Sequence, residues 1–461
     1  MKQYRRSSYL IDVDLDMEPG KHIFIHGYTG AIDLVSNKIS EFLKRTPSFD
    51  EGNMEFSKET FDVLTARGYV TQKTKEEEYD YVSRLAALLH RDSKRFGKSF
   101  IFLVSYDCNF RCPYCYEAGI SGNGRSWSRK TFTKELVDKA YDAMLEIEPD
   151  REKHHKTITL YGGEPLLKEN VEIVRYIVNK GTGLGYNFHA VTNGHDLDYY
   201  EDILALDSFN FLQITLDGDR EMHDSRRFHY ETGKSFEKVF ANIKLALDNN
   251  VRVGVRFNAD ANNYMEIPKL EKLFKEAGYS DNKNFSFNAA LLQDENPENI
   301  NENINYVSRE DFNRMYKEAG LNISQQHYGL YEKLMSALKN NRCIRFHSIF
   351  CGVQSGSYIF DPLGDIHTCW DMVGIKKYAI GTYSSGLEWN ENLKDWHGRN
   401  IGNTPQCSHC IYALLCGGGC LGKTLKKKND DFKASYCDGY ADTVRLMANK
   451  AYGEIKAANI I

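Results

Sequence analysis

Six short runs of β-prone residues, separated by segments with helical periodicity, occupy the middle of the chain. The runs cover residues 99–105, 156–162, 187–193, 211–217, 252–258 and 284–292. Between the fourth and fifth runs, Phe236, Val239 and Ile243 recur at helical spacing behind Ser235. Parallel neighbouring strands need such crossover connections. The alternation therefore predicts an α/β fold in which helices pack outside a parallel sheet.

Motifs rich in glycine and polar residues follow these strands. The first strand leads into "CNFRCPYCYE" (108–117), and the next three end at "GGEP" (162–165), "TNG" (192–194) and "TLDG" (215–218). "HDSRR" (223–227) comes shortly after the last of these. Ligands of parallel sheets and barrels bind at the carboxyl ends of the strands. We therefore expect these motifs to face one mouth.

Composition narrows the class of protein. The chain has 461 residues, a net charge of −5 and eleven cysteines. The lack of a basic excess argues against nucleic acid as a partner. The N-terminal segment lacks a signal-peptide core and no apolar run is long enough to span a membrane, so we expect a cytoplasmic protein with no membrane partner. Because thiols stay reduced in the cytoplasm, the cysteines are expected to bind metal.

The regions on either side of the alternation predict two further domains. Residues 22–35 are two β-prone runs around a Gly27–Gly30 turn, and helical patterns follow from Ser36 and Ser57. A winged-helix-like domain fits this order, with a plain N-terminal extension as the alternative. The last eight cysteines all follow residue 340, and residues 357–369 predict a hairpin that turns at "DPLG". We expect three domains, at 1–97, 98–340 and 341–461.

The loop after the first strand supplies three thiolates, from Cys108, Cys112 and Cys115, with no histidine nearby to complete a set of four. A structural zinc site is closed by four protein ligands. An iron–sulfur cluster accepts the same thiolates and can leave one iron open to an external ligand. The loop therefore favours an iron site that is open for chemistry.

This spacing, C-x-x-x-C-x-x-C with Tyr114 just before the last cysteine, resembles the hallmark of the radical SAM superfamily. The resemblance implies a partial (β/α)6 barrel of TIM-like type. It also implies a [4Fe–4S] cluster whose unique iron chelates the amino and carboxylate groups of S-adenosylmethionine. Reductive cleavage of the sulfonium then yields a 5′-deoxyadenosyl radical that abstracts hydrogen from a substrate.

The same resemblance assigns contacts with S-adenosylmethionine to seven residues. They are Tyr114, Gly162, Gly163, Glu164, Asn193, Thr215 and Arg227. The glycines would permit close backbone approach, the glutamate would bind the ammonium group, and the threonine and arginine would hold the carboxylate. The tyrosine would lie beside the adenine, and the asparagine would reach the ribose or the carboxylate. A tight turn is the alternative for the glycines, and a fold-stabilising role is the alternative for Thr215 and Arg227.

The later cysteines follow a longer pattern. Cys351 is followed by twelve residues, Gly364, four residues and Cys369. A C-x-x-C-x5-C-x3-C run and a final cysteine come next, at Cys407, Cys410, Cys416, Cys420 and Cys437. This order resembles the SPASM domain of radical SAM enzymes that modify peptides and proteins, which holds two auxiliary [4Fe–4S] clusters. A zinc ribbon is the alternative.

Family connectivity interleaves these ligands. One auxiliary cluster would take Cys351, Cys369 and Cys420, with Cys343 as its fourth ligand. The other would take Cys407, Cys410, Cys416 and Cys437. With the first loop, three clusters then account for all eleven cysteines. If Cys343 is instead a free thiol, the first auxiliary cluster has an open site for a substrate thiolate.

The N-terminal domain bears on the substrate. Enzymes that mature ribosomally made peptides often carry a winged-helix-like element that binds a leader peptide as an added strand. We therefore expect an oxidoreductase that installs a thioether or carbon-based cross-link in a precursor peptide with a leader sequence. An external electron donor, such as a flavodoxin or ferredoxin, would reduce the enzyme.

Two alternatives stay open. The first is an anaerobic sulfatase-maturating enzyme, which generates formylglycine. Such relatives have an aspartate directly after the cysteine that matches Cys369, whereas this chain has Trp370 there and Asp371 next. A shift of one position reverses the face in a strand, which counts against this alternative. The second is a non-enzymatic iron–sulfur electron carrier, against which the motifs at one mouth argue.

Overall fold

The computed structural model describes residues 2–95, 97–117, 128–292, 304–321, 329–340, 342–437 and 439–458. The chain divides into two compact units. The first contains Met1–Arg95, His327–Ser355 and Gly398–Ile461, and the second contains Phe96–Gln326 and Gly356–His397. The division into three domains at 97 and 340 stays a prediction.

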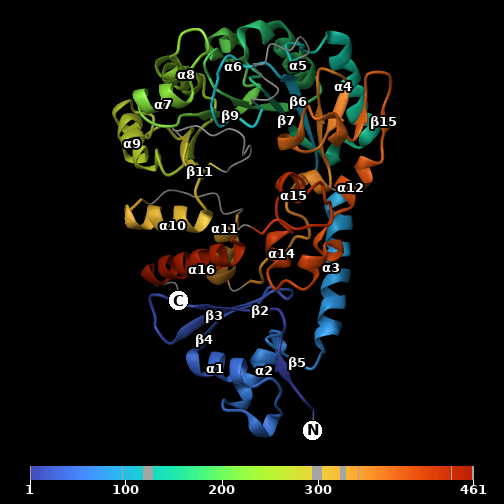
Figure 1. Cartoon of the computed structure of the whole chain (residues 1–461), viewed down its shortest axis with the longest axis vertical. Helices are drawn as coiled ribbons and strands as arrows, with labels where there is room; N and C mark the ends of the chain where they lie inside the picture. The colour runs from blue at the N-terminus through green and yellow to red at the C-terminus, as the bar shows by residue number, and fades with distance from the viewer. Residues whose placement is uncertain are drawn as a thin grey trace. The chain divides into compact units, whose positions relative to one another are not determined.

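A parallel sheet forms the centre of the second unit. Six strands pair in the order β11-β10-β9-β8-β7-β6, and all these neighbours run parallel. They are β6 (Lys98–Ser105), β7 (His154–Gly162), β8 (Asn187–Thr192), β9 (Phe209–Thr215), β10 (Val253–Ala259) and β11 (Phe285–Leu291). Figure 1 labels β6, β7, β9 and β11 of this sheet. The six predicted strands and the α/β fold class are confirmed.

Helices connect these strands. They are α4 (Lys134–Ile147), α5 (Val171–Gly183), α6 (Glu201–Leu204), α7 (Arg220–Arg226), α8 (Phe236–Asp248) and α9 (Ile267–Glu276), and α10 (Arg309–Glu318) follows β11. In α8, Val239 and Ile243 are fully buried, which confirms the face that the sequence spacing predicts.

A hairpin from the cysteine-rich segment extends the sheet. β12 (Ser357–Phe360) and β13 (Asp365–His367) pair antiparallel, which confirms the predicted hairpin. β12 also pairs parallel with β6, and β14 (Gly381–Thr382) and β15 (Glu388–Trp389) continue the sheet beyond β13. The sequence pattern predicts the hairpin but not its place, because periodicity does not say which edge a distant strand joins.

The first unit begins with an antiparallel sheet in the order β2-β3-β4. Its strands are β2 (Leu10–Asp14), β3 (Lys21–His26) and β4 (Ile32–Ser36), so the hairpin around Gly27–Gly30 is confirmed. Helices α1 (Asn37–Arg45) and α2 (Lys58–Ala66) follow where helical patterns predict them, and β5 (Val70–Thr71) pairs with β1 (Arg5–Arg6). The sequence pattern missed β2 and the long helix α3 (Lys75–Arg95).

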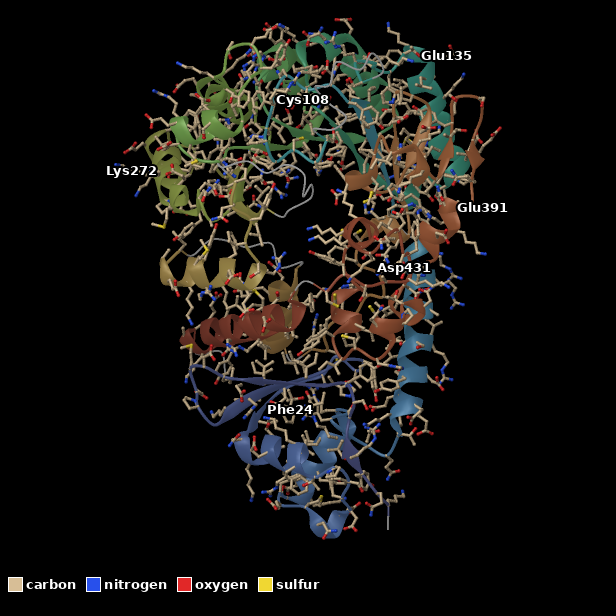
Figure 2. All side chains as sticks on the ribbon, viewed as in Figure 1. Phe24, Cys108, Glu135, Lys272, Glu391 and Asp431 are labelled. Atoms are coloured by element: carbon tan, nitrogen blue, oxygen red, sulfur yellow. The ribbon has the colours of Figure 1, made fainter. Side chains whose placement is uncertain are left out.

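Both faces of this sheet are buried. On one face, Ile23 packs with Leu334 of α11 (Leu330–Asn340) and Met447 of α16 (Tyr440–Ala457). On the other face, Phe24, labelled in Figure 2, packs with Phe61 of α2. Because alternate residues of a strand face opposite sides, β3 is buried along almost its whole length. The exposed backbone of the sheet is therefore confined to its edge strands, β2 and β4.

Three short helices lie in the cysteine-rich part of the first unit, and Cys407 and Cys416 are within two of them. They are α13 (Pro405–Ser408), α14 (Ala413–Cys416) and α15 (Leu421–Lys427), and α12 (Asn392–Gly398) precedes them. Gly417, Gly418 and Gly419 have φ values of 75°, 90° and 75°, so three left-handed residues turn the chain between Cys416 and Cys420. Among the helices that the structure describes, none is both long and apolar enough to cross a membrane.

Candidate active site and metal centres

The first cysteine loop starts just after β6, at the carboxyl end of the parallel sheet. Figure 2 labels Cys108 at the start of this loop. The N–H of Phe110 donates to Sγ of Cys108 at 3.4 Å, and the N–H of Cys115 donates to the carbonyl oxygen of Cys112 at 3.1 Å. All three thiols are free and half-buried. The loop therefore places Cys112 and Cys115 at the two ends of one tight turn, with Cys108 four residues before it.

Electrostatic interactions show that these thiols lie close together. Burial raises the pKa of Cys108 and Cys112, and it raises the pKa of Cys115 to about 12. Cys112 adds to this effect at both other thiols, whereas the Arg227 guanidinium opposes it at Cys112. Metal ligation removes the thiol proton, so a cationic neighbour favours it. Three neighbouring soft ligands fit a [4Fe–4S] cluster with one iron open.

Gly162 and Gly163 let β7 end directly against the backbone that leads into this loop. A Cβ on Gly162 would lie 2.2 Å from the carbonyl oxygen of Ser105, and one on Gly163 would lie 2.4 Å from that of Asp107. The N–H groups of Gly163 and Glu164 donate to the same two oxygens, at 3.0 and 2.8 Å. The glycines thus permit a close backbone approach to the cysteine loop itself. Their contact with S-adenosylmethionine stays a prediction.

Glu164 connects this strand end to the next one. Its Oε1 accepts from Oγ1 of Thr192 and its Oε2 accepts from the N–H of Asn193, both at 2.6 Å. Burial raises the pKa of Glu164 to about 7 despite these hydrogen bonds. Asn193 also donates from Nδ2 to Oδ1 of Asn109 at 2.7 Å, within the cysteine loop. Three of the predicted motifs are therefore joined by hydrogen bonds.

A polar network at the end of β9 joins the remaining motifs. The hydroxyl of Tyr114 donates to Asp217 and accepts from Nη1 of Arg227 at 2.8 Å. Asp217 also accepts from the N–H of Asn258 at 3.1 Å. Thr215 is buried at the last position of β9. The sequence pattern points to the tyrosine, threonine and arginine but misses Asp217 and Asn258, although Asp217 lies within "TLDG".

Arg227 has a donor available for a ligand. Its Nε is buried and has no hydrogen-bond partner among the described residues. The neighbouring Arg226 is fully buried and pairs with Asp260 at 2.9 Å, which is a structural role. Arg227 instead lies beside the cysteine loop, with its guanidinium carbon 5.8 Å from the ring centroid of Phe110. A half-buried guanidinium with a buried, unused Nε donor fits a carboxylate ligand.

Glu117, two residues past the third cysteine, is buried near a second acid, Asp371. Glu117 is 2% exposed, and burial together with the charge of Asp371 raises its pKa to about 8. Asp371 lies in a 3-10 helix, Trp370–Met372, rather than in a strand. The expectation that a shift of one residue turns this acid to the opposite face is therefore wrong, because the rule needs the two-residue period of a strand. The carboxylate of Asp371 raises the pKa of Glu117, which belongs to the segment that follows the three cysteines.

Four thiols of the first unit also lie together. They are Cys407, Cys410, Cys416 and Cys437. Burial, together with interactions among the four thiols, raises the pKa of Cys407 to about 12 and that of Cys416 to about 11. This is the set that family connectivity assigns to one auxiliary cluster. Its ligation of iron stays a prediction.

The other predicted ligands lie in separate elements. Cys351 is exposed before a 3-10 turn, and Cys420 starts α15, both in the first unit. Cys369 is buried after β13 in the second unit. Cys343 is exposed, and its Cβ lies 3.2 Å from where a Cβ on Gly30 would stand. Whether Cys343 is the fourth ligand stays a prediction.

A further buried trio, Asp361, Asp365 and His367, has potential metal-ligating atoms within 4.8 Å of one another. Both carboxylates already have partners. Asp361 accepts from the hydroxyl of Tyr106 at 2.8 Å, and Asp365 pairs with Lys376. These contacts account for the trio as part of the β12–β13 hairpin.

Comparison with known sequences agrees with this geometry. Residues 102–260 match the radical SAM superfamily. The chain is 24% identical over 352 residues to a cysteine-type anaerobic sulfatase-maturating enzyme of Clostridium novyi, covering 70% of this chain and 88% of that protein. It is 22% identical over 450 residues to the radical SAM cyclopropyl synthase TigE of Paramaledivibacter caminithermalis, covering 92% of this chain and 90% of that protein.

Two solved structures share the fold. Native anSMEcpe with bound AdoMet matches with a TM-score of 0.58 and 19% identity, over 79% of this chain and 100% of that chain. Streptococcus suis SuiB bound to precursor peptide SuiA matches with a TM-score of 0.52 and 13% identity, over 95% of this chain and 99% of that chain. Because the family match contains the cysteine loop and the strand ends around it, residues 102–260 are a radical SAM domain.

Proposed function

We propose that the protein is a peptide maturase, which removes hydrogen from a precursor peptide and installs a thioether or carbon-based cross-link. Radical SAM enzymes related to it include both sulfatase maturases and the cyclopropyl synthase TigE. The observation that carries the choice is the N-terminal sheet β2-β3-β4, which provides an edge where a peptide can add. TigE and SuiB cover 92% and 95% of the chain, whereas the sulfatase maturase covers 70%.

The residues of the barrel mouth have clear tasks in this reaction. In this superfamily a [4Fe–4S] cluster and S-adenosylmethionine together supply a radical that takes hydrogen from substrate. Cys108, Cys112 and Cys115 would hold the cluster, and the unused donor of Arg227 would bind the carboxylate of S-adenosylmethionine. Tyr114 fixes the orientation of Arg227 through a hydrogen bond of 2.8 Å. The protein thus binds and orients, while the cofactors supply the chemistry.

Substitution of Arg227 by methionine is expected to weaken the binding of S-adenosylmethionine by about ten- to a hundredfold, the effect of one hydrogen bond to a charged group. The iron content is expected to stay unchanged. Arg220→Met is the control, because Arg220 lies on α7 just before this site and its side chain is 67% exposed. Equilibrium dialysis against labelled S-adenosylmethionine measures both. Equal affinities in the two variants would show that Arg227 is structural.

The leader peptide is proposed to add to β4. At β2, the carbonyl oxygens of Leu10 and Asp14, at both ends, accept hydrogen bonds from side chains. At β4, among the described residues, Nη2 of Arg67 donates to the carbonyl oxygen of Ile32, at one end of the strand. Leu34 is 43% exposed in the middle of β4 and offers an apolar contact. Backbone pairing would supply affinity there, and such side-chain contacts would supply specificity.

Leu34→Lys is expected to weaken peptide binding by about tenfold, because it replaces an apolar contact with a charge that must be desolvated. Leu88→Lys is the matched control, since Leu88 is 47% exposed on α3, away from the sheet edge. Fluorescence anisotropy with a labelled peptide from any short open reading frame found next to the gene measures both affinities. A loss of equal size in the two variants would argue against β4 as the docking strand.

The sulfatase-maturase alternative has a specific observation in its favour. Asp371 lies close enough to the cysteine loop to raise the pKa of Glu117, so an acid near the mouth is available as a base. Such an enzyme would convert a cysteine of its substrate to an aldehyde rather than form a link.

Co-expression with any short cysteine-containing open reading frame found next to the gene, followed by tandem mass spectrometry, tests the proposed function. A peptide lighter by two hydrogens per link, with the link located in its fragments, is the expected result. An aldehyde in place of a thiol would support the sulfatase-maturase alternative and overturn the proposal.

A further inference from the structure

Arg399 is a buried cation among the cysteines of the first unit. This residue is only 3% exposed. Nη2 donates to the carbonyl oxygens of Gly418 at 3.1 Å and Ala434 at 2.8 Å. Gly418 is the middle residue of the turn between Cys416 and Cys420. The guanidinium is therefore held against the loop that contains two predicted ligands, one for each auxiliary cluster.

The backbone of Arg399 is tied to the turn after a third predicted ligand. Its carbonyl oxygen accepts from Nε2 of Gln354 at 3.1 Å. The N–H of Gln354 donates to the carbonyl oxygen of Cys351 at 3.2 Å. Gln354 is fully buried, so this link is shielded from water. The arginine thus spans the segments that carry Cys351, Cys416 and Cys420.

Two donors of this guanidinium remain unused. Nε and Nη1 are buried and have no hydrogen-bond partner among the described residues. Burial lowers the pKa of Arg399, and the thiols of Cys407, Cys416, Cys420 and Cys351 act in the opposite direction, so they lie near its charge. A buried cation with two unsatisfied donors is costly unless a negative group completes it. A thiolate-ligated cluster is such a group.

We propose that Arg399 is a positioning residue that donates hydrogen bonds to the auxiliary cluster held by Cys407, Cys410, Cys416 and Cys437, and that it makes this cluster easier to reduce. The proposal rests on the ligand assignment given above. Reduction adds one electron from a low-potential donor and makes the cluster more negative, and the guanidinium keeps its proton throughout. Hydrogen bonds to cluster sulfur and a nearby positive charge both stabilise the reduced form.

The first test uses the full chain with Cys108, Cys112 and Cys115 changed to alanine, so that spectra report the auxiliary clusters. The protein is labelled with ¹⁵N-arginine and reduced with dithionite. Pulsed electron paramagnetic resonance is expected to show hyperfine coupling from ¹⁵N to a reduced cluster, and Arg399→Lys is expected to abolish it. Iron bound without any ¹⁵N coupling would overturn the proposal. Absence of auxiliary iron would instead overturn the ligand assignment.

The second test measures potentials in the same background. Arg399→Gln is expected to lower the ratio of reduced to oxidised cluster at a fixed potential by about tenfold, equal to about 59 mV for one electron. Arg399→Lys is expected to restore part of this change. Arg445→Gln, which removes an exposed charge from α16, is the control and is expected to shift nothing. An unchanged potential in Arg399→Gln with full iron would contradict the proposal, and if that variant loses iron the ¹⁵N coupling decides.

Discussion

Replacing Cys112 with alanine is expected to abolish the reductive cleavage of S-adenosylmethionine and to lower the iron content by about four atoms per chain, the content of one [4Fe–4S] cluster. Cys112 is the middle thiol of the loop in sequence, and its charge raises the pKa of both other thiols, so it lies near both of them. Two remaining thiols cannot hold a cluster that needs three protein ligands. Quantification of 5′-deoxyadenosine after anaerobic reduction, together with iron analysis, measures both effects.

Cys410→Ala provides the comparison for this experiment. Cys410 belongs to the four-thiol group of the first unit, so its loss is expected to remove auxiliary iron but to spare some cleavage of S-adenosylmethionine. The modified peptide is nevertheless expected to be lost. If Cys112→Ala still produced 5′-deoxyadenosine at the rate of the unsubstituted enzyme, the loop at 108–115 would not be the site of cleavage.

Gly163→Ala is expected to have the second-largest effect. The new Cβ would lie 2.4 Å from the carbonyl oxygen of Asp107 and 2.6 Å from that of Tyr106, and both are backbone atoms that cannot rotate away. Overpacking of this kind costs about 1–3 kcal/mol in unfolding free energy. The displaced segment leads directly into Cys108, so cluster loading is expected to fall as well. Thermal unfolding and iron content of the reconstituted protein measure the two consequences.

Gly183→Ala is the matched control for that substitution. Gly183 lies in α5, and a Cβ added there meets nothing within 4 Å. Alanine is favoured over glycine in helices, so this variant is expected to be as stable as the unsubstituted protein or slightly more stable. If the two variants had the same thermal stability and iron content, the contact between β7 and the cysteine loop would not depend on the absence of a side chain at Gly163.

The sequence predicts most of the catalytic half of the fold because its signals are local. All six parallel strands appear where β-prone runs were found, and the motifs after the first three strands are joined through Glu164 and Asn193. The hairpin around Gly27–Gly30 is likewise set by adjacent residues. Such features depend on periodicity and turn residues within a short stretch of chain.

The features that the sequence does not predict depend on contacts between distant residues. Nothing near Asp371 indicates that its carboxylate acts on Glu117, and a 3-10 helix replaces the strand that the pattern suggested. Arg399 is an ordinary arginine in the sequence, and its burial against Gly418 appears only once the chain has folded. Asp217 lies within a recognised motif, but its hydrogen bond with Tyr114 joins positions far apart in the chain.

Transfer of hydrogen from the peptide is the step that defines the proposed activity. A peptide that co-expression identifies as the substrate is produced with deuterium at its carbon-bound positions and is incubated anaerobically with the reconstituted enzyme, reductant and S-adenosylmethionine. We expect 5′-deoxyadenosine that carries one deuterium and a peptide that has lost two hydrogens for each new link. Unlabelled 5′-deoxyadenosine, formed while the peptide keeps its full mass, would contradict the assignment of this protein as a peptide maturase.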